Sequence, residues 1–239
     1  MKLALLGYGK MGKEIEKLAA EKGHKIMLII DQPEEWEKSR TELSQADVAI
    51  DFSTPDSVIS NIHACFDAGV PVVVGTTGWH EQIEEIRAEC LTRGQSFFWA
   101  PNFSIGVNLF FELNRKLASL MSSWPEYEIS LEETHHIQKL DTPSGTAIVL
   151  ANDIIRHHSR KQKWVKEGTE DPEDLGIRSY RVEDVTGTHK VIYDSPDDLI
   201  EIIHTAKSRR GFAWGAILAA EWLVGKHGFF EMKDLLGET

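Results

Sequence analysis

The feature that most constrains the fold is a glycine-rich turn between a strand-like segment and a helix-like segment. The apolar run at residues 3–6 is a strand candidate and stops at Gly7. Beyond the turn, Met11, Ile15 and Leu18 recur at the spacing of one helix face. The turn itself reads Gly7-Tyr8-Gly9-Lys10-Met11-Gly12. A strand, a tight turn and a helix in this order predict the first unit of an α/β fold.

The same alternation continues along the first hundred residues. Further buried strand candidates lie at residues 26–30, 48–52, 71–74 and 96–99, and helix-prone polar stretches lie at 55–68 and 79–93. Apolar strands separated by helices are typical of a parallel sheet that is covered on both faces. We therefore predict an α/β fold with a doubly wound parallel sheet.

The rhythm changes after Asn102. A helix is expected at 104–122, a strand at 127–133, a helix at about 143–159 and three later strands. The polar segment 158–176 is interpreted as an exposed excursion, and the apolar helix at 212–224 as a return to the first domain. The prediction is a dinucleotide-binding domain of residues 1–103 and 210–239, with a second, α+β domain of residues 104–209.

Composition excludes several classes of protein. The chain has 239 residues, of which 41% are hydrophobic and 27% charged, and this balance is typical of a globular protein. A net charge of −12 without a basic stripe argues against a nucleic-acid partner. No apolar run is long enough for a signal peptide or a membrane span. Cys65 and Cys90 lie far apart and suggest no disulfide framework, so we expect a cytoplasmic protein.

The glycine-rich turn predicts a nicotinamide dinucleotide site. Gly7 allows the tight turn, Gly9 lets the backbone approach the pyrophosphate, and Gly12 permits close packing of helix on strand. Asp31 follows the second strand, where a carboxylate can accept hydrogen bonds from the adenosine ribose and repel a 2′-phosphate. This favours NADH, although Lys10 and Lys13 leave NADPH possible. An isolated glycine turn would be a structural loop without a ligand, but its place at the first strand–helix junction favours the cofactor.

Two more segments are expected at the same edge of the sheet. The fourth predicted strand ends at Gly75, Thr76 and Thr77, and the fifth at Ala100, Pro101, Asn102 and Phe103. Ligands bind at the carboxyl ends of the strands in open α/β sheets. Each segment alone would be an ordinary turn, but together they predict the lining of the nicotinamide half of the site.

Acid–base and anion-binding residues gather at 132–147. His135 titrates near neutral pH and Lys139 carries a mobile ammonium group, so both can stabilise an anion and deliver a proton. The stretch from Pro143 to Thr146 is a predicted helix start whose amides suit a carboxylate. Neighbouring histidines on a strand face opposite sides and no third ligand has a familiar spacing, so we predict no metal site.

These motifs resemble the dihydrodipicolinate reductase family over nearly the whole chain. The match rests on GYGKMG at 7–12, DFSTP at 51–55, VVVGTTG at 72–78, APNFSIGVN at 100–108, ETHHIQKLDTPSGTA at 133–147 and SRRGFAWGA at 208–216. The resemblance implies a Rossmann-type domain that binds NAD(P)H and a central α+β domain that binds the substrate and builds a homotetramer. It also implies NAD(P)H-dependent reduction of 4-hydroxy-tetrahydrodipicolinate, a small dicarboxylate, to tetrahydrodipicolinate in lysine and diaminopimelate biosynthesis.

The resemblance assigns roles to individual residues. His135 matches the proton donor or acceptor, Lys139 the second catalytic proton donor, and His136, Gly145 and Thr146 the substrate carboxylate site. Arg209 matches an arginine near the hinge between domains. Gln138 departs from the family, which often has a third histidine there. The cofactor residues implied are Gly7, Tyr8, Gly9, Lys10, Met11, Gly12, Asp31, Gly75, Thr76, Thr77, Ala100, Pro101, Asn102 and Phe103.

Two other functions are compatible with the glycine turn alone. One is another two-domain NAD(P)-dependent amino-acid dehydrogenase, and the other is a non-catalytic sensor that binds a nicotinamide cofactor. Neither accounts for His135 and Lys139 directly followed by an anion-binding helix start.

Overall fold

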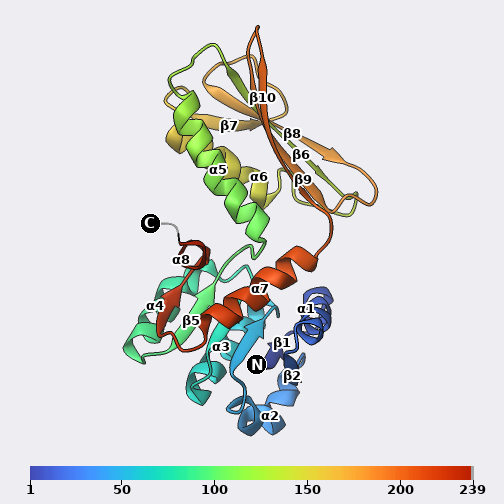
Figure 1. Cartoon of the computed structure of the whole chain (residues 1–239), viewed down its shortest axis with the longest axis vertical. Coiled ribbons are helices and arrows are strands. Elements are labelled where there is room, and N and C mark those ends of the chain that lie inside the picture. The colour runs from blue at the N-terminus through green and yellow to red at the C-terminus, as the bar shows by residue number, and fades with distance from the viewer. Residues whose placement is uncertain (238–239) are drawn as a thin grey trace. The chain divides into compact units, whose positions relative to one another are not determined.

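The computed structural model describes residues 1–237, except for the side chains of Pro33, Glu37, Lys38 and Arg40. The chain divides into two compact units. One comprises Met1–Ile105 together with Arg209–Thr239, and the other comprises Gly106–Ser208. Each unit has its own sheet and its own hydrophobic core (Figure 1).

The first unit contains a parallel sheet with the strand order β11-β5-β4-β3-β1-β2. Its strands are β1 (Lys2–Leu6), β2 (Lys25–Ile30), β3 (Val48–Asp51), β4 (Val72–Val74), β5 (Ser96–Trp99) and β11 (Gly228–Phe230). Its helices are α1 (Lys10–Glu21), α2 (Trp36–Leu43), α3 (Pro55–Ala68), α4 (Ile83–Thr92), α7 (Arg210–Leu223) and α8 (Met232–Leu236), with short 3₁₀ turns at Pro33–Glu35 and His80–Gln82.

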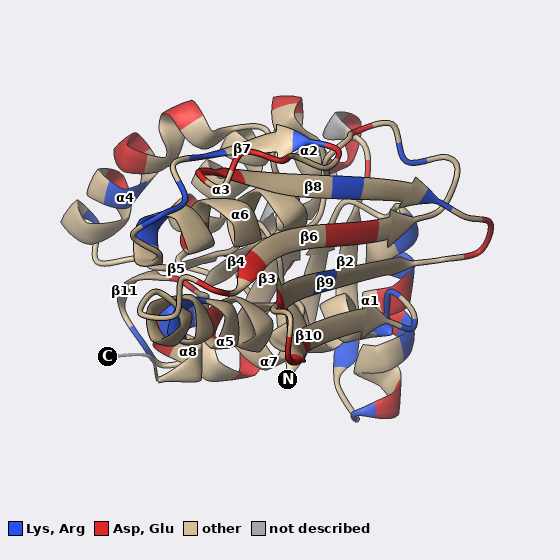
Figure 2. Ribbon diagram, turned by 90° about the horizontal axis from the view of Figure 1, so that it is seen from above, with Lys and Arg blue, Asp and Glu red and all other residues tan. Residues whose placement is uncertain are grey.

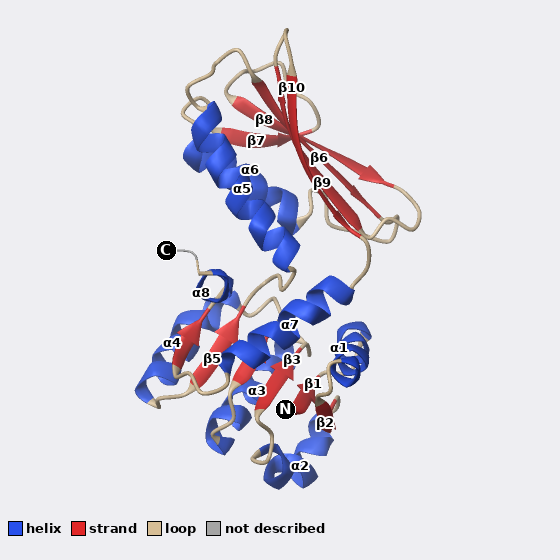
Figure 3. Cartoon of the chain, viewed as in Figure 1, coloured by secondary structure: helices blue, strands red, loops and turns tan. Residues whose placement is uncertain are grey.

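Helices cover both faces of this sheet, as Figure 3 shows. Successive residues of β1 point to opposite faces, so Leu3 and Leu5 pack with α1 and α7, whereas Ala4 and Leu6 pack with α2, α3 and α4. All four side chains are at most 1% exposed. Apolar residues at every position of a strand therefore reflect burial on two sides, and the predicted doubly wound sheet is confirmed.

The second unit pairs a mixed sheet with two helices. The strand order is β10-β9-β6-β8-β7, in which β6 is parallel to β8 and antiparallel to β9. Its elements are α5 (Ile105–Met121, which starts in the first unit), β6 (Glu128–His135), α6 (Gly145–His157), β7 (Lys163–Lys166), β8 (Asp174–Arg181), β9 (Gly187–Asp194) and β10 (Leu199–Ala206). Alternate residues of β6 and β9 pack against α5 and α6 in one core.

The segment 158–176 was predicted to be exposed along its whole length, but residues near its start and its end are buried. His158 and Lys161 are each only 3% exposed, and the segment supplies β7 and the start of β8. The Lys161 ammonium donates to the backbone carbonyl oxygens of Pro172 and Asp174 at 2.9 and 2.8 Å. A lysine that is satisfied by carbonyl groups can be buried, and composition alone does not reveal such partners.

Candidate functional site

The glycine-rich turn lies at the carboxyl end of β1, as the sequence predicts. Gly7 has a φ of +89°, and its amide N–H donates to the carbonyl oxygen of Ile30 at 2.7 Å. Gly9 is the N-cap of α1, so the first amide groups of that helix open at this edge of the sheet. Tyr8, Lys10, Met11 and Gly12 occupy the turn and the first turn of α1.

A cavity of about 260 Å³ lies beside this turn. Asp31 lines it, and its Oδ1 accepts a hydrogen bond from the Tyr8 amide at 2.6 Å. The carboxylate of Glu35 accepts from the amides of Asp31 and Gln32 at 2.6 and 2.9 Å. No Lys or Arg is among the described residues that line the cavity. The described lining therefore carries the acidic side chains of Asp31 and Asp56 and no basic one.

The segments Gly75–Thr77 and Ala100–Phe103 follow β4 and β5, at the carboxyl edge of the sheet. The Thr76 hydroxyl donates to Asp51 Oδ1 at 2.6 Å, in the sheet interior. Ala100 and Phe103 are also buried, at 1% and 2% exposure. Contacts of these three residues with a cofactor would therefore involve their backbone groups.

Asp51 was not anticipated as part of this arrangement. Its fully buried carboxylate also accepts from the amide and hydroxyl of Ser53 and from the side-chain amide of Asn61, at 2.8 to 3.0 Å. Burial raises the pKa of Asp51, while these hydrogen bonds oppose that rise. The network joins the end of β3 to the loop after β4, and so fixes the shape of the carboxyl edge of the sheet.

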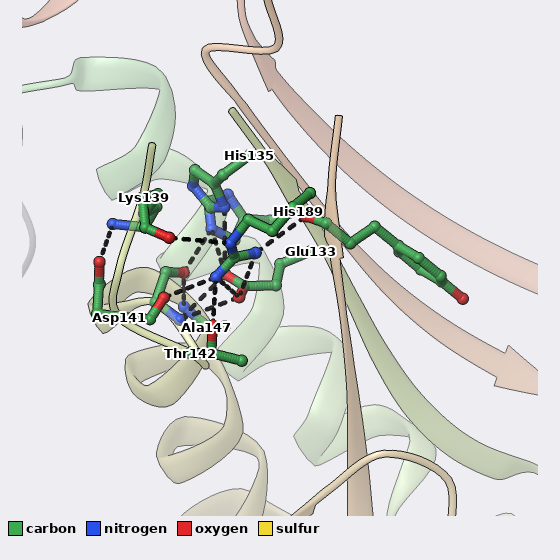
Figure 4. Close-up of polar contacts among 10 residues, drawn as sticks. Glu133, His135, Lys139, Asp141, Thr142, Ala147 and His189 are labelled. Carbon is green, nitrogen blue, oxygen red and sulfur yellow. Dashed lines mark hydrogen bonds and ion pairs between the residues drawn. The ribbon is translucent and has the colours of Figure 1, made fainter. Parts of the chain in front are cut away.

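The predicted proton donors lie at the end of β6 and in the loop that follows it. His135 is the last residue of β6 and is 7% exposed. The Lys139 ammonium lies 2.9 Å from Asp141 Oδ1, and Figure 4 shows that it points away from the His135 ring. The Lys139 side chain is 24% exposed.

The predicted anion-binding residues Gly145 and Thr146 lie at the start of α6. The Ser144 side chain is the N-cap and accepts from the Ala147 amide at 3.3 Å. The first intrahelical bond runs from the Ile148 amide to Ser144, so the amides of Gly145 and Thr146 precede it and face outward from the helix start. Such amides bind carboxylates well. His136, Gln138 and Arg209 are placed, respectively, just after β6, in the exposed loop and at the N-cap of α7.

A buried cluster behind His135 was missed by the sequence analysis. Glu133, His135 and His189 each offer one possible ligand atom, and these three atoms lie within 4.8 Å of one another. All three residues are buried. Glu133 and His189 are directly opposite in the antiparallel pairing of β6 and β9. The only sequence signal is the two-residue spacing of Glu133 and His135, which places both on one face of a strand.

This cluster could hold a metal ion by its geometry. However, the Glu133 carboxylate already accepts from the Ser144 amide at 3.1 Å, and Arg181 lies 3.4 Å away. Ser144 Oγ lies 3.1 Å from His189 Nε2. Hydrogen bonding and ion pairing therefore account for the arrangement of these groups without a metal, and the absence of a metal stays a prediction.

His189 should make the stability of the protein depend on pH. Burial, followed by repulsion from His135, lowers its pKa from 6.5 to about 3. The unfolded chain binds a proton below pH 6.5 while the folded chain does not, so its stabilising contribution is full above 6.5 and is lost as pH falls toward 3. His189→Gln should flatten this decline by up to about 1.4 kcal/mol per pH unit.

Urea unfolding between pH 6.5 and 5.5 measures this effect, because Glu side chains of the unfolded chain, whose ordinary pKa is 4.5, take up protons mainly below this range. His63→Gln is the control, since His63 is an exposed histidine of the first unit. Equal slopes for wild type and His189→Gln would contradict the assignment.

Comparison with known proteins gives the family. A family model described as "Dihydrodipicolinate reductase, N-terminus" matches residues 1–103, and one described as "Dihydrodipicolinate reductase, C-terminus" matches residues 106–236. The chain belongs to the dihydrodipicolinate reductase family. A Christiangramia forsetii protein named 4-hydroxy-tetrahydrodipicolinate reductase is 47% identical over 100% of this chain and 98% of its own length. A Lawsonia intracellularis protein of the same name is 34% identical over 95% and 96%.

Solved structures agree on the fold. Dipicolinate-bound dihydrodipicolinate reductase from Paenisporosarcina sp. TG-14 has a TM-score of 0.75, with 22% identity over 98% of each chain. An amine dehydrogenase from Mycobacterium smegmatis has a TM-score of 0.57, with 8% identity over 95% of this chain and 93% of its own. The predicted family, fold class and NAD(P)H-dependent reductase activity are confirmed.

Proposed function

We propose that this dihydrodipicolinate reductase family member reduces 4-hydroxy-tetrahydrodipicolinate to tetrahydrodipicolinate. The 4-hydroxyl group leaves the substrate ring as water. The resulting unsaturated ring takes up a hydride, which a bound nicotinamide cofactor would supply, and a proton at the adjacent carbon. His135 and Lys139 supply the acid–base groups, whereas His136 and the amides of Gly145 and Thr146 bind a substrate carboxylate. A nicotinamide cofactor supplies the hydride when it is bound at the Gly7–Gly12 turn.

One observation carries this proposal. A single segment of the second unit combines a buried histidine, a partly exposed lysine and a helix start with outward amides. A cyclic dicarboxylate needs both a proton and anion-binding groups, and fixed donors stabilise charge better than mobile water does. A protein that only bound the cofactor would need neither the proton donors nor the anion-binding amides.

A coupled assay tests the reaction. The preceding synthase generates the substrate in place from pyruvate and aspartate semialdehyde, and the oxidation of NADH or NADPH is followed by absorbance. We expect oxidation that depends on the synthase. A protein that binds NADH but shows no synthase-dependent oxidation would contradict the proposed function.

We further propose that NADH is preferred to NADPH. Asp31 and Asp56 are the acidic residues among those described as lining the cavity, and Asp31 also binds the Tyr8 amide of the glycine-rich turn. Asp31→Asn keeps an oxygen for the Tyr8 amide but removes the charge that repels a 2′-phosphate. We expect the ratio of kcat/KM for NADH over NADPH to fall on the order of tenfold, about 1.4 kcal/mol. Glu34→Gln, which lies outside the cavity lining, should not change this ratio, and an unchanged ratio in Asp31→Asn would refute the role.

A homotetramer is the proposed assembly. The face of the second sheet opposite its helices carries exposed apolar side chains, including Tyr180, Leu199 and Ile203 at 45%, 54% and 54%. On the same sheet the Glu132 carboxylate lies 3.9 Å from the Arg178 guanidinium and 3.6 Å from the Lys190 ammonium. Figure 2 shows the acidic colour on β6 between basic colour on β8 and β9. Exposed apolar patches mark association surfaces, and analytical ultracentrifugation measures the assembly.

The proposed compartment is the cytoplasm, because Cys65 and Cys90 are free, buried thiols. Within residues 1–237, no helix combines the length and apolar character needed to cross a bilayer.

A further inference from the structure

Glu133 is a buried charge for which the proposed reaction has no role so far. Its side chain is inaccessible to solvent and lies on the same face of β6 as His135, two residues away. A carboxylate is removed from water only at a large cost unless it is paired and hydrogen-bonded. The partners of Glu133 therefore indicate why it is there.

Its contacts join the two halves of the chemical site. Glu133 Oε2 lies 3.3 Å from His135 Nδ1, and both carboxylate oxygens accept from the Ser144 amide at 3.1 Å. Ser144 is the N-cap of α6, where the carboxylate site begins. One buried group thus touches both the proton donor and the start of the anion-binding helix (Figure 4).

Arg181 lies beside the Glu133 carboxylate and holds the loop next to it. Its guanidinium lies 3.4 Å from Glu133 Oε1, and it also donates to the backbone oxygens of Lys139 and Asp141 at 3.3 and 2.6 Å. Burial alone would raise the pKa of Glu133, but the contacts of His135 and Ser144 outweigh it and hold that pKa far below its usual range.

The other ring nitrogen of His135 faces a different environment. A Cβ at Gly187 would lie only 3.0 Å from His135 Nε2, so the glycine leaves room at this nitrogen that a side chain would fill. The two nitrogens are therefore distinct, since Nδ1 faces an anion and Nε2 faces a glycine. The nitrogen next to a carboxylate carries the proton in the neutral ring, because the ionised oxygen accepts but cannot donate.

We infer that Glu133 is a positioning residue, which fixes His135 as the Nδ1–H tautomer and presents Nε2 to the substrate. His135 Nδ1 is buried 3.3 Å from Glu133 Oε2 without an aligned hydrogen bond. Catalytic hydrogen bonds often align only when a substrate is bound. The inference rests on the proposed role of His135, because a tautomer matters for turnover only if the ring exchanges a proton with the substrate. Because the same carboxylate also binds the Ser144 amide, it fixes the position of the His135 ring relative to the start of α6.

The experiment compares full-length Glu133→Gln with Glu132→Gln. Glu132 is the adjacent residue of the same type on the opposite face of the sheet, where it pairs with Arg178 and Lys190. Protein labelled with ¹⁵N-histidine is examined by NMR at alkaline pH, and the His135 ring signals are assigned with His135→Gln. Turnover is measured in the coupled assay, and NADH binding shows that each variant is folded.

We expect wild type and Glu132→Gln to carry the proton on His135 Nδ1, and Glu133→Gln to shift it toward Nε2. The kcat of Glu133→Gln should fall on the order of 10²-fold with little change in KM, within the roughly 10⁴-fold that the carboxylate partner of a catalytic histidine can supply. Loss of packing alone would not move the tautomer signals.

Three results would overturn the inference. One is a wild-type ring protonated on Nε2, which is decisive even if Glu133→Gln does not fold. The second is a metal-bound Nδ1 without a proton, and the third is full turnover in Glu133→Gln. The tautomer readout needs no turnover, so it stands apart from the proposed function, which fails instead if wild type shows no synthase-dependent oxidation.

Discussion

A double variant, His135→Gln with Lys139→Ala, should lose turnover by about 10⁴-fold or more while binding NADH as the wild type does. Each positioned acid–base group contributes roughly 10²- to 10⁴-fold. Both residues lie in the second unit, whereas the glycine-rich turn lies in the first. The coupled assay gives the turnover, and a fluorescence titration gives the dissociation constant of NADH.

The matched control for this prediction is His157→Gln with Lys163→Ala. Both control residues are exposed and belong to the same unit as the proposed proton donors. The two single variants should each lose much of the activity, because groups that act together are not additive. Turnover within a few-fold of wild type in the double variant would refute the assignment of His135 and Lys139.

Alanine at Gly9 should abolish most of the affinity for NADH without unfolding the chain. Gly9 is exposed, and a Cβ there would meet no atom within 4 Å, so the fold tolerates it. A pyrophosphate on the amides of α1 would meet that methyl group. We expect the dissociation constant of NADH to rise on the order of tenfold or more, measured by fluorescence titration.

Alanine at Gly7 should instead damage the fold. Gly7 has a φ of +89°, and a Cβ there would lie 2.4 Å from the carbonyl oxygen of Phe52. We expect a loss of about 2–4 kcal/mol in the free energy of unfolding.

The prediction for Gly9 has a clear contradicting result. If Gly9→Ala binds NADH as tightly as the wild type does, the pyrophosphate does not contact this turn.

Local patterns were sufficient to predict most elements of the first unit. The glycine turn, β1 to β5 and the helices α1, α3, α4 and α7 depend on residues close in sequence and lie where they were predicted, whereas α2 and α8 were not predicted. β11 was missed because Gly228–Phe230 is a three-residue strand, too short for a periodic signal.

Pairing between distant strands could not be predicted. Glu133 meets His189 only because β6 pairs with β9 in one particular register. The two residues are far apart in the sequence, and no motif links them. A shift of one residue in the strand pairing would turn His189 to the other face of the sheet. Lys161 was missed for a related reason, since its partners are backbone carbonyls of a later loop. Motifs located the proposed proton donors, but not the groups that orient them.

Isotope transfer tests whether this protein moves a hydride from NADH to the substrate ring. NADH deuterated at the transferable position of its nicotinamide ring is supplied with synthase-generated substrate, and the product is analysed by mass spectrometry. We expect one deuterium in each molecule of tetrahydrodipicolinate, because the hydride would pass from cofactor to substrate ring. Product without deuterium, or NADH oxidation without tetrahydrodipicolinate, would contradict it.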